Sequence, residues 1–267
     1  MRRNGIVLCA CVGILLGGCR STGVNYHPAD TTPTPMPDSA TSAEKAEDAA
    51  RVHTDLAQHY MQNGDLQTAL AKVKLALKFD PNYEPAHTVI AVIYERINDM
   101  PDAEQNYRKA VDLKPTQGAA NNNLGAFLCR VGKSAEAMPY FQKAVADPFY
   151  ATPDMALTNA GVCQMRSNDL VSAEASFRKA IAVNPQNADA LYQLANVLYL
   201  GNDISRAGAF LQRYEALGQS NPAALKLGHD IEIRQGDRDA ALNYRRRLLS
   251  QFPDSEQARA LDSTASP

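Results

Sequence analysis

Residues 84–117 read EPAHTVIAVIYERINDMPDAEQNYRKAVDLKPTQ, and most of the chain after residue 50 repeats this pattern. Ile90, Ala91 and Tyr94 are spaced i, i+1 and i+4, so they lie on one face of a helix. The small side chain of Ala91 allows a second helix to approach that face closely. The Asn-Asp pair at residues 98–99 then predicts a polar turn.

The second half of the stretch predicts a second helix. Ala103, Tyr107 and Ala110 are spaced i, i+4 and i+7, which again places them on one helical face. Pro115 cannot continue this helix, so the chain has to turn back for the next unit. The stretch therefore predicts one helix-turn-helix unit.

This spacing resembles the tetratricopeptide repeat, in which L-G/A-x-x-Y is followed by A-x-x-x-F and then by proline in a unit of about 34 residues. The resemblance implies an all-α fold, a right-handed superhelical array of about six such repeats. The absence of tryptophan and the low aromatic content fit closely packed short helices. The expected units are residues 50–83, 84–117, 118–151, 154–187, 188–221 and 221–254.

Some units depart from the pattern. Residues 152–153 look like a two-residue insertion before the fourth unit, and Gln164 stands where that unit should carry a tyrosine. Tyr214 in the fifth unit and Arg247 in the sixth replace small residues. A last unit has no successor to pack against, so we interpret Arg247 as part of a polar cap.

Residues 1–18 have the organisation of a secretory signal. Arg2 and Arg3 precede an uninterrupted small and apolar run over residues 6–16, which is too short to span a bilayer as a permanent helix. The following L-G-G-C at residues 16–19 resembles the lipobox of bacterial lipoproteins. This resemblance implies cleavage before Cys19 and acylation of Cys19, for example by palmitate. A plain signal peptide with an incidental cysteine is the alternative.

The segment after Cys19 predicts a tether and then the array. Arg20 stands where an aspartate would retain an enterobacterial lipoprotein in the inner membrane, so the resemblance implies an outer-membrane anchor with the protein on the periplasmic side. Residues 19–41 are rich in proline and lack an apolar period, which predicts a flexible tether. A T-x-x-E capping box at Thr41 predicts a first helix over residues 42–62. We expect the array to occupy residues 42–262 and a disordered tail to occupy residues 263–267.

The sequence contains no constellation that predicts an enzyme. The five histidines are scattered, and no metal-binding, phosphate-binding or nucleophile motif is present. A formal net charge of -2 offers no basic surface to nucleic acid. We therefore expect no catalysis, cofactor, metal, nucleic acid or small-molecule substrate.

Cys129 and Cys163 are predicted on the first helices of neighbouring units. An oxidising compartment such as the periplasm would permit a disulfide between them. The usual separation of packed helix axes, roughly 8–10 Å, disfavours one.

In arrays of this kind the first helix of each unit lines the concave face, which can hold a peptide. The second and third units are polar there, with Glu95, Arg96 and Arg130. Methionine and tyrosine suit an adaptable binding surface, although neighbouring helices could instead cover these side chains. The fourth and fifth units contribute an apolar set to this predicted groove: Met155, Val162, Met165, Tyr192, Tyr199 and Leu200.

A lipobox, a proline-rich tether and six repeats together resemble the PilF/PilW-type pilotins of type IV pili. The resemblance implies a protein partner, the pilus secretin, which a pilotin escorts to the outer membrane and helps to multimerise. It also implies a partner-binding groove in the first repeat, where the matching residues are Val52, Leu56, His59, Met61 and Val73. The alternative is an outer-membrane adaptor for a periplasmic protease or murein hydrolase.

Overall fold

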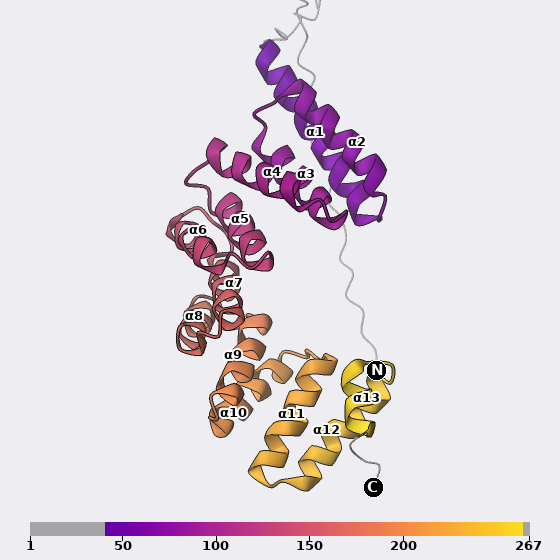
Figure 1. Cartoon of the computed structure of the whole chain (residues 1–267), viewed down its shortest axis with the longest axis vertical. Coiled ribbons are helices and arrows are strands. Elements are labelled where there is room, and N and C mark those ends of the chain that lie inside the picture. The colour runs from indigo at the N-terminus through magenta and orange to yellow at the C-terminus, as the bar shows by residue number, and fades with distance from the viewer. Residues whose placement is uncertain (1–40, 264–267) are drawn as a thin grey trace, which may run out of the picture. The chain divides into compact units, whose positions relative to one another are not determined.

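The computed structural model describes residues 41–263, which form helices joined by short turns (Figure 1). Cys19, the signal segment and most of the expected tether lie outside the described residues, as do residues 264–267. Within residues 41–263 there are thirteen helices and no strand. The helices are α1 (Ser42–Gln62), α2 (Leu66–Phe79), α3 (Glu84–Arg96), α4 (Met100–Leu113), α5 (Gly118–Arg130), α6 (Ser134–Ala146), α7 (Pro153–Arg166), α8 (Leu170–Val183), α9 (Ala188–Leu200), α10 (Ile204–Ala216), α11 (Pro222–Gln235), α12 (Arg238–Gln251) and α13 (Glu256–Ser263).

The first twelve helices form six pairs, α1–α2 to α11–α12, whose members pack against each other. The turn inside each pair contains one residue with a left-handed backbone, either glycine or asparagine, the residue types that tolerate a positive φ. The spacing of these turn residues is 34 except between the third and fourth pairs, where it is 36 because of the insertion before α7. The residues are Gly64, Asn98, Gly132, Asn168, Asn202 and Gly236.

Side chains at the helix starts explain where several helices begin. α1 begins with the predicted capping box, in which the Thr41 hydroxyl accepts from the Glu44 N–H and the Glu44 carboxylate accepts from the Thr41 N–H. An aspartate follows the turn residue in five of the six pairs, as at Asp65 and Asp169, and its carboxylate caps the second helix. These local signals are present in the sequence itself.

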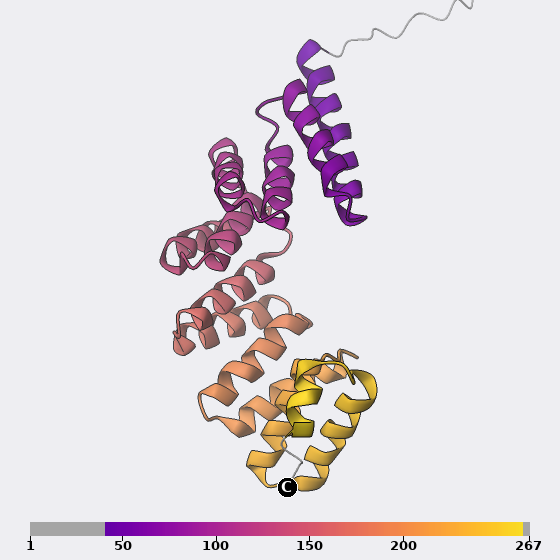
Figure 2. The same cartoon turned by 45° about the vertical axis from the view of Figure 1, so that its right-hand side comes forward.

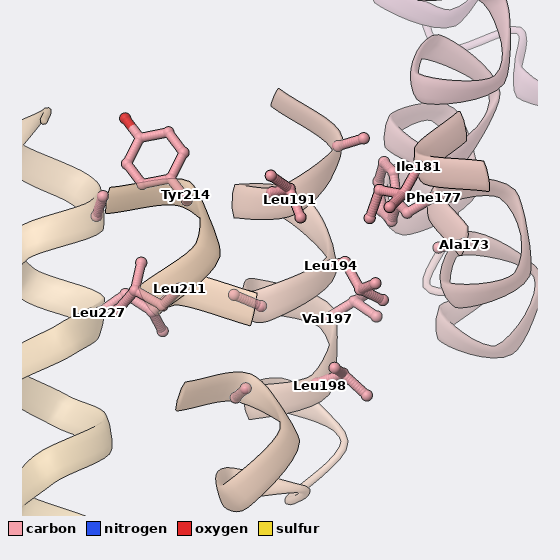
Figure 3. Packing of buried hydrophobic residues seen from close by; sticks show 14 of the residues in the cluster. Ala173, Phe177, Ile181, Leu191, Leu194, Val197, Leu198, Leu211, Tyr214 and Leu227 are labelled. Atoms are coloured by element: carbon pink, nitrogen blue, oxygen red, sulfur yellow. The ribbon is translucent and has the colours of Figure 1, made fainter. Parts of the chain in front are cut away.

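In three of the pairs, a glycine of the first helix faces an aromatic ring of the second. A Cβ atom placed on Gly161 of α7 would lie only 2.5 Å from the Phe177 ring of α8. Gly125 faces Phe141 in the same way. The largest buried cluster joins Phe177 to Leu194 and other apolar side chains of α9, α10 and α11 (Figure 3).

Successive pairs stack because the second helix of each pair packs against the first helix of the next. The contacts are α2 with α3, α4 with α5, α6 with α7, α8 with α9, and α10 with α11, and the two views agree with this order (Figures 1 and 2). First helices also touch one another, as α5 touches α7. The interior is thus continuous from pair to pair, as expected of tetratricopeptide repeats.

The interpretation of Arg247 as a polar cap is wrong. α13 packs against α11 and α12, where Leu225, Leu248 and Leu261 form a small buried cluster. Arg247 instead points back to the preceding pair, where its guanidinium lies 2.8 Å from the Glu215 carboxylate of α10. The sixth unit is not the end of the packed array, because α13 follows it and packs on both of its helices.

Candidate protein-binding surfaces

The predicted groove residues of the fourth and fifth units differ in exposure. Met155 and Leu200 are more than half exposed. Val162 and Met165 are partly buried and pack against the large apolar cluster of α8 to α11. This set is therefore less open than its sequence suggests, and its role in binding stays a prediction.

The two tyrosines of this set are held by neighbouring side chains. Tyr192 lies 5.8 Å from Tyr214 between ring centroids, and burial, followed by the nearby Tyr214, raises the pKa of the Tyr192 hydroxyl. Tyr199 lies under the guanidinium of Arg234, 5.2 Å from its ring centroid. Tyr214, which departed from the repeat pattern, is thus a packing partner of Tyr192.

The first repeat exposes residues that the later repeats bury. Val52 and Leu56 of α1 are 47% and 37% exposed. The corresponding residues of the second repeat, Ala86 and Ile90 of α3, are 0% and 4% exposed because the preceding pair covers them. Within the described residues no helix covers Val52 and Leu56 in the same way, so α1 presents an unoccupied inter-repeat packing face.

The other residues predicted in the first repeat fall into three environments. His59 is exposed on the same face as Val52, and its Nε2 lies 3.1 Å from the Asn63 amide nitrogen. Met61 is partly buried. Val73 is 0% exposed and packs in the core between α1, α2 and α3, so its assignment to a partner-binding surface is wrong. Its pattern position already indicated a core role.

The exposed face of α1 has further apolar and acidic borders. Phe79, at the end of α2, is 44% exposed and stacks on the His53 ring with a centroid distance of 5.4 Å. Asp48 and Asp55 are exposed and lie four residues before and three residues after Val52, hence on the same helical face. Asp48 is paired with Arg51 at 3.1 Å. The surface is therefore apolar at its centre and acidic along one side.

The arginines at the ends of the first helices connect neighbouring pairs. Arg96 donates to the Met61 carbonyl at 2.9 Å, and Arg130 donates to both carboxylate oxygens of Glu95 at 2.5 and 2.8 Å. Arg166 donates to the Cys129 carbonyl at 3.5 Å. Glu95, Arg96 and Arg130 were expected only as polar groove residues, whereas they form these links between pairs. Their recurrence at the same repeat position is the signal that could have revealed them.

Cys129 and Cys163 form a disulfide between α5 and α7, with their Cα atoms 5.5 Å apart. The expectation that helix separation disfavours this bridge is wrong. The general distance between helix axes does not apply here, because α5 and α7 bring these two side chains together at their facing surfaces. The bridge links the third and fourth pairs across the insertion.

The described histidines have structural neighbours. His87 lies 2.9 Å from both the Pro81 carbonyl oxygen and the Asn106 amide oxygen, which ties α3 to the preceding turn and to α4. Among residues 41–263, no group of three or more His, Cys, Asp or Glu side chains could hold a metal ion. Over the same range, no helix combines the length and apolar character that crossing a membrane requires.

Comparisons with known proteins agree with the repeat architecture. Two models of the tetratricopeptide repeat match, one over residues 38–84 and 88–151 and the other over residues 164–228. The type IV pilus assembly protein PilF of Pseudomonas aeruginosa is 26% identical over 254 residues, which is 95% of each chain.

Two solved structures are similar over most of their length. The crystal structure of PilW, a widely conserved type IV pilus biogenesis factor, has 34% identity and a TM-score of 0.74, and the match covers 79% of this chain and 97% of that one. A P. aeruginosa PilF structure has 24% identity and a TM-score of 0.74, with 82% and 99% covered. The chain therefore belongs to the tetratricopeptide-repeat family of type IV pilus biogenesis factors that PilW represents.

Proposed function

We propose that this protein is a pilotin: it binds the secretin of a type IV pilus and promotes the secretin's localisation to the outer membrane and its multimerisation there. Family membership supports a role in pilus biogenesis. The observation that carries the binding step is the open packing face of α1. Val52 and Leu56 occupy positions that are buried in the following repeat, and they are exposed here.

The chemistry of this face indicates what the secretin segment should present. Apolar side chains of the secretin segment would cover Val52, Leu56 and Phe79. Burying this apolar surface would stabilise the complex. Basic side chains would face Asp48 and Asp55 along the edge. An amphipathic segment with one apolar face and a basic border meets both requirements.

The anchor forms the second part of the proposal. Acylated Cys19 would hold the chain at the periplasmic side of the outer membrane. Twenty tether residues have a reach of roughly 60 Å when extended. The array would therefore work close to the membrane into which the secretin assembles.

The first experiment replaces Leu56 by glutamate in the full chain. The new carboxylate lies on the apolar face beside Asp55, so we expect secretin binding to fall at least about tenfold, as for other interface anchors. Heat-resistant secretin multimers should fall in parallel. Val171→Glu is the matched control, because Val171 is 84% exposed at the start of α8 and also apolar. Circular dichroism should show the same helix content in both variants.

The result separates the pilotin from other lipoprotein adaptors. If Leu56→Glu leaves the secretin multimers at their normal level, the α1 face does not serve the secretin. Altered murein or altered protease substrates with intact multimers would favour an adaptor of a periplasmic hydrolase instead.

The anchor is tested separately by Cys19→Ser. We expect the protein to leave the membrane fraction and the secretin to accumulate away from the outer membrane. Normal secretin localisation with a released Cys19→Ser protein would exclude a transport role for the lipid.

A further inference from the structure

The helices α6, α7 and α8 enclose a hollow of about 300 Å³. Its floor is apolar and includes Met138, Phe141 and Ala160. Its polar lining comes from Gln142, Ser176 and Lys179. The hollow lies outside the α1 face and outside the predicted groove residues.

Small residues of the fourth repeat create this hollow. Ala160 occupies a position where each of the other five repeats has leucine or isoleucine: Leu56, Ile90, Leu124, Leu194 and Leu227. Gln164 occupies the tyrosine position, and its amide turns toward the Ser176 hydroxyl, 2.7 Å away. The volume of one large apolar side chain is therefore missing between α6 and the fourth pair.

The next repeat shows which side chains narrow the equivalent space. Ser176 corresponds to Phe210, which is 34 residues later, and Lys179 corresponds to Arg213 at the same spacing. The guanidiniums of Arg178 and Arg213 lie 5.5 and 5.3 Å from the centroid of the Phe210 ring. The corresponding hollow there, about 200 Å³, is smaller. In the next repeat, an aromatic ring beside two cations thus lines and narrows the equivalent space.

The chain also carries an exposed aromatic ring of the required kind. Phe149 lies in the loop between α6 and α7, ahead of the two-residue insertion, and is 94% exposed. The Asp147 carboxylate accepts from the Phe149 N–H at 2.9 Å and from the Gly118 N–H at 2.6 Å. Tyr150 packs on Gly118, where an added Cβ would lie 2.5 Å from the Tyr150 side chain. The loop is therefore held at both ends of the exposed residue.

We propose that the hollow at Ala160 receives the Phe149 ring of a second copy of this chain. The ring would take the place that Phe210 occupies in the following repeat, on the apolar floor and beside the Lys179 ammonium. Burying the exposed ring and filling the missing volume both favour this contact. The proposal stands on these contacts alone and does not rest on the secretin function.

A contact centred on one ring is smaller than the roughly 1,200 Å² of a stable interface, so we expect weak association. Photo-crosslinking in the full chain detects such contacts. We would place p-benzoylphenylalanine at Phe149 and co-express a second copy with a different epitope tag. Irradiation should yield a product of twice the chain mass that carries both tags, with the crosslinked peptide within residues 138–179.

Filling the hollow is the decisive control. Ser176→Phe introduces the residue of the following repeat at the mouth of the hollow, and Ala160→Leu introduces the residue type of all the other repeats. Each variant should reduce the two-tag product at least tenfold while the helix content is unchanged. If Ala160→Leu does not fold, the yield of the two-tag product is compared in Ser176→Phe and in Lys179→Glu, which changes an exposed residue at the rim of the hollow. Both variants should reduce this yield. The probe placed at Leu242, an exposed residue of α12, should give no two-tag product.

Three results would overturn the proposal. The first is a Phe149 probe that yields no two-tag product. The second is a crosslinked product that joins the Phe149 probe to a different protein and not to a second copy of this chain, which would make that protein the binding partner of Phe149. The third is a two-tag product that persists at full yield in Ser176→Phe, because the ring would then contact another surface.

Discussion

Removal of the Cys129–Cys163 disulfide should destabilise the array by a predictable amount. The bridge closes a loop of 34 residues. In the chain-entropy model, closing such a loop lowers the entropy of the unfolded state by about 12.6 cal/mol/K, which stabilises the folded state by about 3.8 kcal/mol of free energy at 25 °C. This corresponds to roughly a 600-fold change in the unfolding equilibrium. Both sulfurs are buried, so we choose Cys129→Ala with Cys163→Ala to avoid adding polar groups to the interior.

The assay is urea unfolding followed by circular dichroism, for the wild-type chain with and without reductant and for the double variant. Reduced wild type and the double variant should unfold at similar, lower urea concentrations than the oxidised wild type. Because repeat arrays can unfold in parts, the loss should appear most clearly in the transition of the third and fourth pairs. Equal midpoints for oxidised and reduced wild type would refute the reasoning, as would two free thiols in protein isolated from an oxidising compartment.

Three further predictions concern the packing and charges of the array. Gly161→Ala should lower the free energy of unfolding by about 1–3 kcal/mol, because its Cβ would meet the buried Phe177 ring. Adding Phe177→Leu to the same chain should recover part of this loss, which a double-mutant cycle measures. Burial raises the pKa of the Glu84 carboxyl, so its contribution to stability is present at low pH and is lost as the pH rises through that pKa. The free energy of unfolding of Glu84→Gln, measured in urea, should therefore rise relative to that of the wild type as the pH is raised from about 4 to about 7. If the difference in unfolding free energy between the two proteins is the same at both pH values, the burial argument is contradicted. Arg130→Met should cost no more than about 1 kcal/mol, since its pair with Glu95 is partly exposed, and the cost should shrink in 1 M salt; a salt-independent loss would indicate packing instead.

The open face of α1 and the hollow at Ala160 are both departures from the repeat pattern, with different physical causes. In a repeat array every position has counterparts that show how it is normally covered. Val52 is exposed because no preceding pair covers it among the described residues, and Ala160 borders a hollow because its side chain is too short. Both surfaces are thus visible as departures from the chain's own repeat pattern.

The local chemistry of the helices was predictable from the sequence. The capping box at Thr41, the asparagine-aspartate turn at residues 98–99 and the proline at Pro115 act over a few residues, so they can be read without the fold. The period of 34 residues then predicted a stack of helical pairs. The insertion before α7 was also visible as a change in that period.

Other features depend on which surfaces meet in three dimensions. Val73 and Leu56 both stand at apolar positions of the repeat pattern in the first repeat, yet only the packing of α1, α2 and α3 decides that Val73 is buried and Leu56 is exposed. The disulfide depends on the local approach of α5 and α7, and the partner of Arg247 depends on the position of α10. The sequence by itself determined the repeating helical pair, because short-range interactions set its period. Only the tertiary structure decided which residues lie open to a partner, because burial depends on contacts between residues that are far apart in the chain.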